Sequence, residues 1–405
     1  MRNCFHAGDI LVPQHISLRQ WACIACDQFS SQTEYWERVR ETVGDAPSTF
    51  HMILPEALLR QGGQDDRMAS IHSHMEQYLQ AGFLRTFRRS FVYVERTMES
   101  GEKRRGLMGQ IDLEEYDYDP ASAAHIRATE GTVRERIPAR MELLRGAKLE
   151  FPHVILLCDD RRDEILSAAR EMAGETLYDF DLMEDGGHIT GKLVTGMGVS
   201  VVNSAVSRYI AATEAGKAPE DCMTFAVGDG NHSLAAAKAC WDELKPTLTP
   251  EEQQEHPARF ALVELENIHD EANRFEPIHR VVKTDNTEAF LAALGALAVP
   301  EGHPLTVVTA QGEQQIFLSR EESPLAVAVL QPFLDRYGAD IDYIHGADVV
   351  RALSRQPGTV GLILPGMDKG DLFPGVLRGG VLPRKTFSMG RAREKRYYLE
   401  GKRRS

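Results

Sequence analysis

The sequence predicts a mixed protein of the α/β to α+β class, and three patterns lead to this prediction. Helix and strand patterns alternate in the middle of the chain, where an apolar strand at 154–158 precedes a helix at 162–173. Segments 177–183 and 188–194 flank paired glycines that suit a hairpin turn. An apolar strand, a glycine turn and an alanine-rich helix follow one another over 223–244. Mixed sheets are therefore expected.

The remaining elements are expected from the spacing of apolar residues, which recur every three or four residues in a helix and every second residue in a strand. The first region has helices at 33–43 and 67–81, and a strand at 91–96 that pairs with 107–113 across a charged turn. Further helices are expected at 132–144, 199–214, 234–244, 287–297 and 324–337, and further strands at 223–227, 258–264 and 360–364 and near Leu305 and Gln315.

The length of 405 residues favours two or three domains, at roughly 150 residues each. An acidic, tyrosine-rich stretch that stops at Pro120 loses periodicity and marks a boundary. We expect an N-terminal α/β region at 1–120 and a central domain with the glycine turn at 121–283. A C-terminal α/β region with a basic tail is expected at 284–405.

Composition excludes several classes of protein. The chain has 60 acidic and 46 basic residues, a formal charge of −14, which opposes binding to nucleic acid or to an anionic membrane. No apolar run reaches the roughly 20 residues that span a bilayer, and the N-terminus lacks the features of a secretory signal. Six cysteines in so long a chain predict free thiols rather than a disulfide framework, so a cytoplasmic location is expected.

The most informative motif is the Gly-Asp-Gly-Asn-His-Ser run at 228–233, between the apolar strand and the alanine-rich helix. Gly228 and Gly230 let a ligand approach the backbone closely, and free N–H groups at a helix start favour phosphate or carboxylate. Asp229 and His232 add acid-base or metal-binding capacity. The plainer alternative is a glycine turn followed by a helix cap, with the acid and the imidazole at the surface.

This run and the helix behind it resemble the signature of the domain-of-unknown-function family 1015. The run is also similar to the Gly-x-His-Arg motif of the ParB/sulfiredoxin superfamily, in which a related loop binds nucleotide phosphates. Ser233 stands where that superfamily usually has arginine, so positive charge must come from another segment. Further stretches agree with the family resemblance, namely those at 25–31, 50–56, 125–140, 150–154, 275–280 and 383–386.

An arginine-rich segment upstream of the motif is the expected source of that charge. Guanidinium groups bind phosphate bidentately, and Arg136 and Arg140 would share one face of a helix. The alternative is a solvated amphipathic helix whose arginines pair with its own acidic residues. The family resemblance favours function for Arg127, Glu130 and Arg134.

Asp27 and His51 are polar residues in mostly apolar early segments. In the resemblance, Asp27 takes the place of the acid in a Pro-Tyr-Asp-Val motif, and it could accept the proton of a hydroxyl during phosphoryl transfer. His51 could orient the substrate, although a structural histidine is the favoured alternative.

Three later residues are weaker candidates. His279 and Arg280 lie where a loop enters a strand, so Arg280 could face an anion or pair with Glu276. Lys385 stands in a basic C-terminal stretch, of which the last four residues are expected to be a solvated tail.

Other familiar signals are weak or missing. Cys23 and Cys26 form a lone Cys-x-x-Cys, expected on a helix as buried thiols rather than as metal ligands. The sequence has no Walker A motif, protein-kinase signature, Gly-x-Ser-x-Gly elbow or His-Glu-x-x-His.

The resemblance implies a nucleotide-dependent phosphotransferase, or a phosphatase using the same site, with serine or phosphoserine as the leading substrate. ATP, ADP or CTP would be the nucleotide, with Mg²⁺ held by Asp229 or Glu130 and Asp27 as the base. A regulatory protein that binds a nucleotide or phosphometabolite without turnover is the alternative. The expected catalytic residues are Asp27, Glu130, Asp229 and His232. The expected cofactor-binding residues are Arg127, Gly228, Gly230, Asn231, Ser233, Arg134, Arg280 and Lys385. The expected substrate-binding residues are His51 and His279.

Overall fold

The computed structural model describes residues 4–30, 32–59, 64–132 and 137–405 of the chain. It divides into two compact units, which are described separately. Unit 1 comprises Met1–Asn273 and Arg391–Ser405, and unit 2 comprises Arg274–Gly390. Unit 2 is therefore an insertion in the chain of unit 1. The Gly390 N–H donates to the Arg274 carbonyl oxygen at 3.3 Å, so the two ends of the insertion lie side by side.

Unit 1 is built on an eleven-stranded mixed sheet. Along its main path the strands follow the order β10, β11, β4, β5, β13, β9, β12, β7 and β6, while β1 pairs with β5 and β2 pairs with β4. The strands of this sheet are β1 Phe5–His6, β2 Gly8–Pro13, β4 Leu84–Thr97, β5 Lys103–Asp112, β6 Tyr116–Asp117, β7 Ile126–Ala128, β9 Ile155–Cys158, β10 Thr176–Asp181, β11 His188–Val194, β12 Phe225–Asp229 and β13 Phe260–Asn267.

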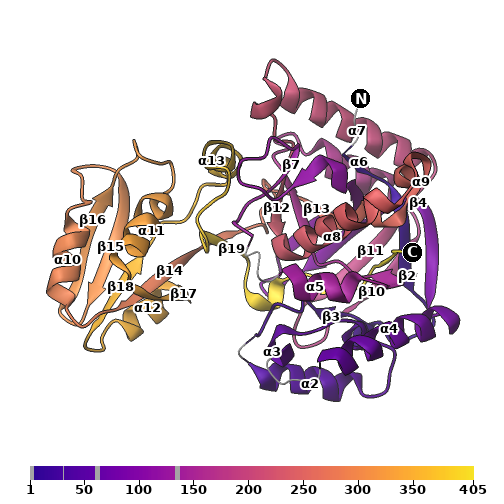
Figure 1. Cartoon of the computed structure of the whole chain (residues 1–405), viewed down its shortest axis with the longest axis horizontal. Helices are drawn as coiled ribbons and strands as arrows, with labels where there is room; N and C mark the ends of the chain where they lie inside the picture. Colours follow the sequence, from indigo (N-terminus) through magenta and orange to yellow (C-terminus); the bar gives the residue numbers. More distant parts are fainter. Residues whose placement is uncertain (1–3, 31, 60–63, 133–136) are drawn as a thin grey trace. The chain divides into compact units, whose positions relative to one another are not determined.

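Helices surround this sheet (Figure 1), with α2, α3 and α4 grouped on one side of unit 1 and α6, α7 and α8 toward the other. The α-helices of unit 1 are α1 Leu18–Trp21, α2 Thr33–Val43, α3 Glu56–Leu59, α4 Gln64–Gln80, α5 Ile137–Leu144, α6 Glu164–Met172, α7 Met197–Glu214, α8 Asn231–Leu244 and α9 Pro250–Glu255.

Strand β4 shows why the sheet carries a core on each face. Successive side chains of a strand point to opposite faces. Val92 and Val94 accordingly belong to the apolar cluster that includes Trp36 of α2, whereas Phe91 and Tyr93 belong to a second cluster with residues of α6, α7 and α8. The central strands are therefore apolar on both faces.

The C-terminal segment of unit 1 forms two short strands. Strand β20, Tyr397–Tyr398, pairs with β3, Cys23–Ile24, and β21, Lys402–Arg403, pairs with β8, Leu149–Glu150. This segment brings residues from the end of the chain next to residues from its beginning.

Unit 2 contains a six-stranded sheet in the order β16, β15, β18, β14 and β17, with β19 against β14. All of these pairings are antiparallel. Its elements are β14 Phe275–Lys283, α10 Thr287–Gly295, β15 His303–Thr309, β16 Gly312–Leu318, α11 Ala326–Tyr337, β17 Asp340–His345, α12 Ala347–Leu353, β18 Thr359–Ile363, α13 Leu372–Gly379 and β19 Phe387–Met389.

The predicted mixed α/β class is confirmed, and the β4–β5 hairpin pairs as expected, with Val92 opposite Met108. The predicted regions divide the chain differently from the two units. The boundary at residue 120 falls inside unit 1 because β5, before it, pairs with β13, after it. The boundary at 283 falls at the end of β14, the first strand of unit 2.

Two local predictions are wrong. Cys23 lies in strand β3 rather than on a helix, because its backbone pairs with Tyr398. The last four residues are not a solvated tail: Lys402 donates to the carbonyl oxygens of Pro257 and Phe260, and Arg404 forms an ion pair with Glu150. All six cysteines are free thiols, as predicted. Among the described residues, no helix has both the length and the apolar character needed to cross a membrane.

Candidate functional site

The glycine turn between β12 and α8 positions the motif. Gly230 has φ +78°, and a Cβ at this position would lie 3.0 Å from Val154 Cα, so both backbone angle and space favour glycine here. Helix α8 begins at Asn231, directly after Gly230. Asn231 does not cap the helix. Its side-chain oxygen accepts the Thr129 N–H at 3.2 Å, which ties the turn to the end of β7.

A histidine that follows β8 lies at the centre of the site. His153 Nε2 is 3.4 Å from Ser233 Oγ at the start of α8 and 3.7 Å from Asp27 Oδ2. The structure thus brings Asp27 and the motif to one imidazole nitrogen, although about 200 residues of sequence separate them. His153 is 3% exposed and Asp27 is partly open to solvent.

The other ring nitrogen is held by a buried tyrosine. The Tyr398 hydroxyl and His153 Nδ1 form a hydrogen bond of 2.7 Å, and the Cys26 N–H donates to the same hydroxyl at 3.2 Å. A tyrosine that accepts from Cys26 can donate its own proton to Nδ1. The other ring nitrogen, Nε2, faces Asp27 and Ser233.

Asp27 is held as a carboxylate. Burial by itself raises the pKa of Asp27, but His153, the hydrogen bond from Gln28, Lys395 and Arg140 together lower it below its usual value. The adjacent thiol behaves in the opposite way, because burial, with Asp27 nearby, raises the pKa of Cys26 to about 12. The site therefore offers an ionised acid and a protonated thiol at neutral pH.

Two cations contribute positive charge to this site. Lys395 Nζ lies 3.1 Å from Asp229 Oδ2, and Asp229 Oδ1 also accepts the Gly230 N–H. Arg140 of α5 donates to Glu56. Both cations also help to lower the pKa of Asp27.

A buried ion network fixes the segment that carries Lys395 and Tyr398. The Arg396 guanidinium is 3% exposed and forms ion pairs with Glu264 of β13 and with Glu400. Arg96 of β4 donates to the carbonyl oxygens of Arg393, Glu394 and Lys395. The segment that precedes β20 is therefore anchored to the central sheet on both sides of Lys395.

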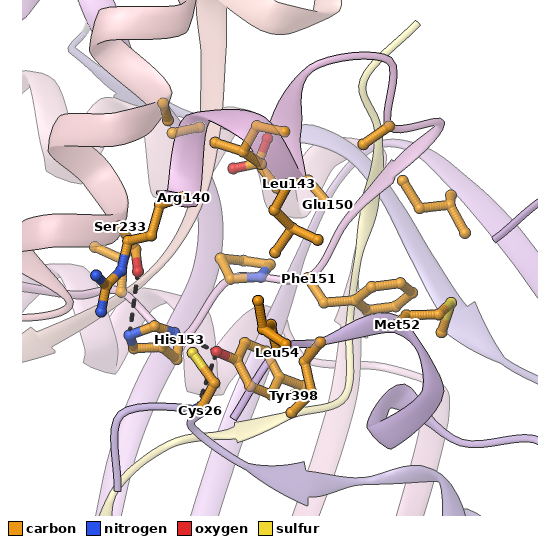
Figure 2. A pocket seen from close by; sticks show the side chains of 18 of the residues that line it. Cys26, Met52, Leu54, Arg140, Leu143, Glu150, Phe151, His153, Ser233 and Tyr398 are labelled. Atoms are coloured by element: carbon orange, nitrogen blue, oxygen red, sulfur yellow. Dashed lines mark hydrogen bonds between the residues drawn. The ribbon is translucent and has the colours of Figure 1, made fainter. Parts of the chain in front are cut away.

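A cavity opens beside His153 (Figure 2), and its volume is about 80 Å³. Ser233, His153, Tyr398 and Cys26 lie together on one side of it, and Arg140 of α5 lies above them. Most of the remaining wall is apolar and comes from α5, α8 and the segments before α3 and after β8.

Other motif candidates have their own partners. Arg127 is 5% exposed and donates to the carbonyl oxygens of Ala124, Glu220 and Cys222, so it braces the backbone behind β7. Glu130 and His232 are half-buried, Glu130 just after Thr129 and His232 in the first turn of α8. Gly228 lies within β12. Arg134, like Arg136, lies outside the described residues.

His51 lies in the 3₁₀ helix Thr49–Met52. Its Nδ1 forms a 2.7 Å hydrogen bond with the Tyr78 hydroxyl, and its ring stacks on His74. Burial, together with His74, lowers the pKa of His51. These contacts suit the structural role that was the favoured alternative.

The three remaining candidates belong to unit 2. Arg280 is fully buried, with Tyr343 under its guanidinium, and it donates to Gln331 and to the Ile278 and Arg384 carbonyl oxygens. His279 Nδ1 accepts the Leu364 N–H at 3.2 Å. Lys385 is exposed, with a positive φ of 56°.

Sequence reasoning missed His153, Lys395 and Tyr398. His153 stood in a stretch noted for the family resemblance, and Lys395 in the basic C-terminal stretch, but neither has a spacing that links it to the motif. Finding them would have required knowledge that strand β20 pairs with β3.

The fit of Mg²⁺ depends on the ligand set. Among the described residues, no three His, Cys, Asp or Glu side chains are grouped as a protein-only metal site would require. Mg²⁺ in nucleotide sites commonly needs one or two carboxylates, because phosphates and water supply the other ligands. Asp229, whose carboxylate lies 3.1 Å from Lys395 Nζ, fits this smaller role.

The sequence match to a known family covers most of the chain. Residues 11–342 match the family described as "Protein of unknown function (DUF1015)", and the chain belongs to it. No curated protein matches the chain.

Several solved structures are similar to it at low identity. SbnI with a C-terminal truncation from Staphylococcus aureus is 10% identical, with a TM-score of 0.38, over 69% of this chain and 81% of that chain. A conserved hypothetical protein from Pyrococcus furiosus is 12% identical, with a TM-score of 0.33, over 72% and 90%. A variant of a free serine kinase in complex with ADP is 13% identical, with a TM-score of 0.37, over 72% and 87%.

Proposed function

We propose that this protein is a nucleotide-dependent phosphotransferase that acts on a small hydroxylated metabolite, with serine as a candidate acceptor and phosphoserine as its product. One observation carries the proposal. An ionised carboxylate, Asp27, lies within 3.7 Å of His153 Nε2, and the same nitrogen lies 3.4 Å from Ser233 at the start of α8. A base and a phosphate-binding turn therefore share one imidazole.

The start of α8 suits the nucleotide phosphates. The first N–H groups of a helix have no partner within the helix and carry partial positive charge, and α8 begins directly after the Gly230 turn. Lys395 and Arg140 replace the arginine that the related motif carries at Ser233. ATP, ADP or CTP are the candidate nucleotides, and Mg²⁺, held by Asp229 and the phosphates, would neutralise charge between the phosphates.

In the reaction, the Asp27 carboxylate accepts the proton of the substrate hydroxyl. The freed oxygen forms a bond to the terminal phosphorus as the bond between that phosphorus and its bridging oxygen breaks. The leaving nucleotide keeps the electron pair of the broken bond. Lys395 lies beside Asp229 and would offset the negative charge that develops on the phosphate oxygens in the transition state. His153 holds Asp27 in position through Nε2.

One observation favours the second candidate, a regulatory protein that binds a nucleotide or phosphometabolite without turnover. Each described cation of the site already faces a carboxylate: Lys395 faces Asp229, and Arg140 faces Glu56. Transfer requires more charge compensation in the transition state than binding does. The same site with weaker compensation would bind a phosphate and leave it intact.

Phosphorus NMR of the full-length protein tests the proposal. The protein is incubated with ATP, ADP or CTP, Mg²⁺ and a panel of hydroxy amino acids, and new phosphate-ester signals are followed. We expect transfer to at least one acceptor, lowered at least about 100-fold by Asp27→Asn and unchanged by Asp285→Asn, an exposed acid of unit 2. Nucleotide binding with no transfer or hydrolysis would favour the regulatory candidate; transfer that survives Asp27→Asn would exclude Asp27 as the base.

A further inference from the structure

The cavity beside His153 has a composition that phosphate chemistry does not need. Leu143 and Leu144 of α5 and Leu234 and Ala237 of α8 line one part of it. The rest of the apolar wall comes from Met52, Ile53, Leu54, Met75, Ala147, Leu149, Phe151, Pro152, Val154 and Ala261. A free serine or a phosphate would leave this wall without a partner.

Most of the polar groups of the cavity gather at one end, and the Glu150 carboxylate, beside Leu143 in another part of the wall, accepts a hydrogen bond from Arg404. Figure 2 shows His153, Ser233 and Tyr398 close together, with Met52 and Phe151 on the opposite side. A molecule that fills the cavity would therefore meet hydrogen-bonding groups at one end and hydrocarbon at the other. A pocket of this kind selects an amphiphilic ligand with its polar end beside His153 and Ser233. Asp27 lies behind this end, with its Oδ2 3.7 Å from His153 Nε2.

The volume limits the size of that ligand. An apolar cavity of roughly 150 Å³ holds benzene and stays free of water when empty. The cavity here, at about 80 Å³, is about half as large and suits a chain of about three or four carbons. A nucleobase is larger than benzene and does not fit, so the cavity is not the binding site of the base.

We infer that this cavity binds the aliphatic side group of a small hydroxylated substrate, whose hydroxyl lies at His153 and Asp27. The inference rests on the proposed function and deepens it, because among small hydroxylated acceptors it favours secondary alcohols with a short alkyl group over serine. The hydroxyl faces the carboxylate that takes its proton, and the alkyl group enters between α5 and α8.

A homologous series of ligands tests the inference without nucleotide. Serine, threonine, 3-hydroxynorvaline and 3-hydroxynorleucine share one polar end and carry zero to three carbons on the hydroxyl-bearing carbon. We expect the dissociation constant, measured by calorimetry or by ligand NMR on the full chain, to fall about fourfold for each added carbon. A dissociation constant that stays level or rises along the series would overturn the inference.

A polar side chain in the wall of the cavity should abolish the dependence of affinity on alkyl chain length. Leu143 is half-buried, so Leu143→Gln can fold, and it should make the four affinities equal within about twofold. Leu244→Gln is the matched control, because Leu244 is also half-buried but does not line the cavity. Should Leu143→Gln fail to fold, Ala237→Leu fills the cavity from α8 and should weaken the longest ligand most. A trend that survives a folded variant of either kind places the alkyl group elsewhere.

The outcome separates this inference from the proposed function. A chain-length trend in binding that Leu143→Gln abolishes supports the inference, even if no phosphoryl transfer occurs. Transfer to serine at the same efficiency as to its longer homologues, with level affinities, overturns the inference and leaves the phosphotransferase proposal in place. Weaker ADP binding in Leu143→Gln, without any trend in the series, also overturns it by assigning the cavity to the nucleotide.

Discussion

Two neighbouring tyrosines of β20 allow the arrangement around His153 to be tested against an internal control. Tyr397 and Tyr398 are 2% and 3% exposed. The Tyr397 hydroxyl donates to the Met183 carbonyl oxygen at 3.0 Å, away from the site. The Tyr398 hydroxyl instead joins the Cys26 N–H to His153 Nδ1. Substitution by phenylalanine removes one oxygen in each case and preserves the ring.

The expected losses differ because the number of abandoned partners differs. A buried polar group left without a partner costs about 1–3 kcal/mol. Tyr397→Phe abandons the Met183 carbonyl and should cost about 1–2 kcal/mol, whereas Tyr398→Phe abandons two groups and should cost about 2–4 kcal/mol. Urea unfolding measures both losses, with the change in slope as a check on the unfolded state.

Only Tyr398→Phe should also change the pH dependence of phosphoryl transfer. Without its partner at Nδ1, the His153 ring can turn away from Asp27 and lose its part in lowering the pKa of that carboxyl. A lowered pKa keeps Asp27 ionised to lower pH, so in Tyr398→Phe the acid limb of the transfer rate should move to higher pH. Tyr397→Phe should leave it unchanged. Equal stability losses, together with the same pH profile in both variants, would refute the arrangement.

Three further predictions concern other parts of the chain. Arg396→Met should destabilise unit 1 by about 3–5 kcal/mol, because Glu264 and Glu400 would stay buried without their cation; an unchanged urea midpoint would contradict this. His232→Ala should leave the melting temperature nearly unchanged and weaken nucleotide binding about tenfold by calorimetry; equal affinity would remove His232 from the site. Burial, with Arg280 nearby, lowers the pKa of His279 to about 4. Between about pH 6.5 and 4 the His279 imidazole therefore binds a proton in the unfolded state but not in the folded state. The free energy of unfolding should fall as the pH drops through this range. The loss reaches about 3 kcal/mol; comparing wild-type and His279→Gln unfolding across this range measures it, and parallel curves would contradict it.

Much of the local structure follows from the sequence. Helix α2 spans the predicted residues 33–43, because its buried residues Tyr35, Trp36, Val39 and Val43 recur at helical spacing. Strand β11 spans the predicted 188–194, and the strand, glycine turn and helix of the motif appear in the predicted order. These elements depend on periodicity and on glycine, which act over a few residues.

The candidate site was predictable only in part. Asp27 and Ser233 were recognisable as polar residues in motifs, and Arg140 as a residue on the basic helix. The hydrogen-bond partners of Arg127 and Arg280 could not be predicted, because a guanidinium that donates to backbone carbonyl oxygens looks the same in sequence as one that faces solvent.

The sequence by itself determined the mixed α/β class, the main helices and strands, and the glycine turn that starts α8. The tertiary structure alone decided that His153 would join Asp27 to Ser233, and that Lys395 and Tyr398 would come from the C-terminal segment of the chain. It also decided the division into two units. Local patterns cannot specify these features, because pairing β20 with β3 joins segments more than 370 residues apart and depends on the burial of Arg396 against Glu264 and Glu400.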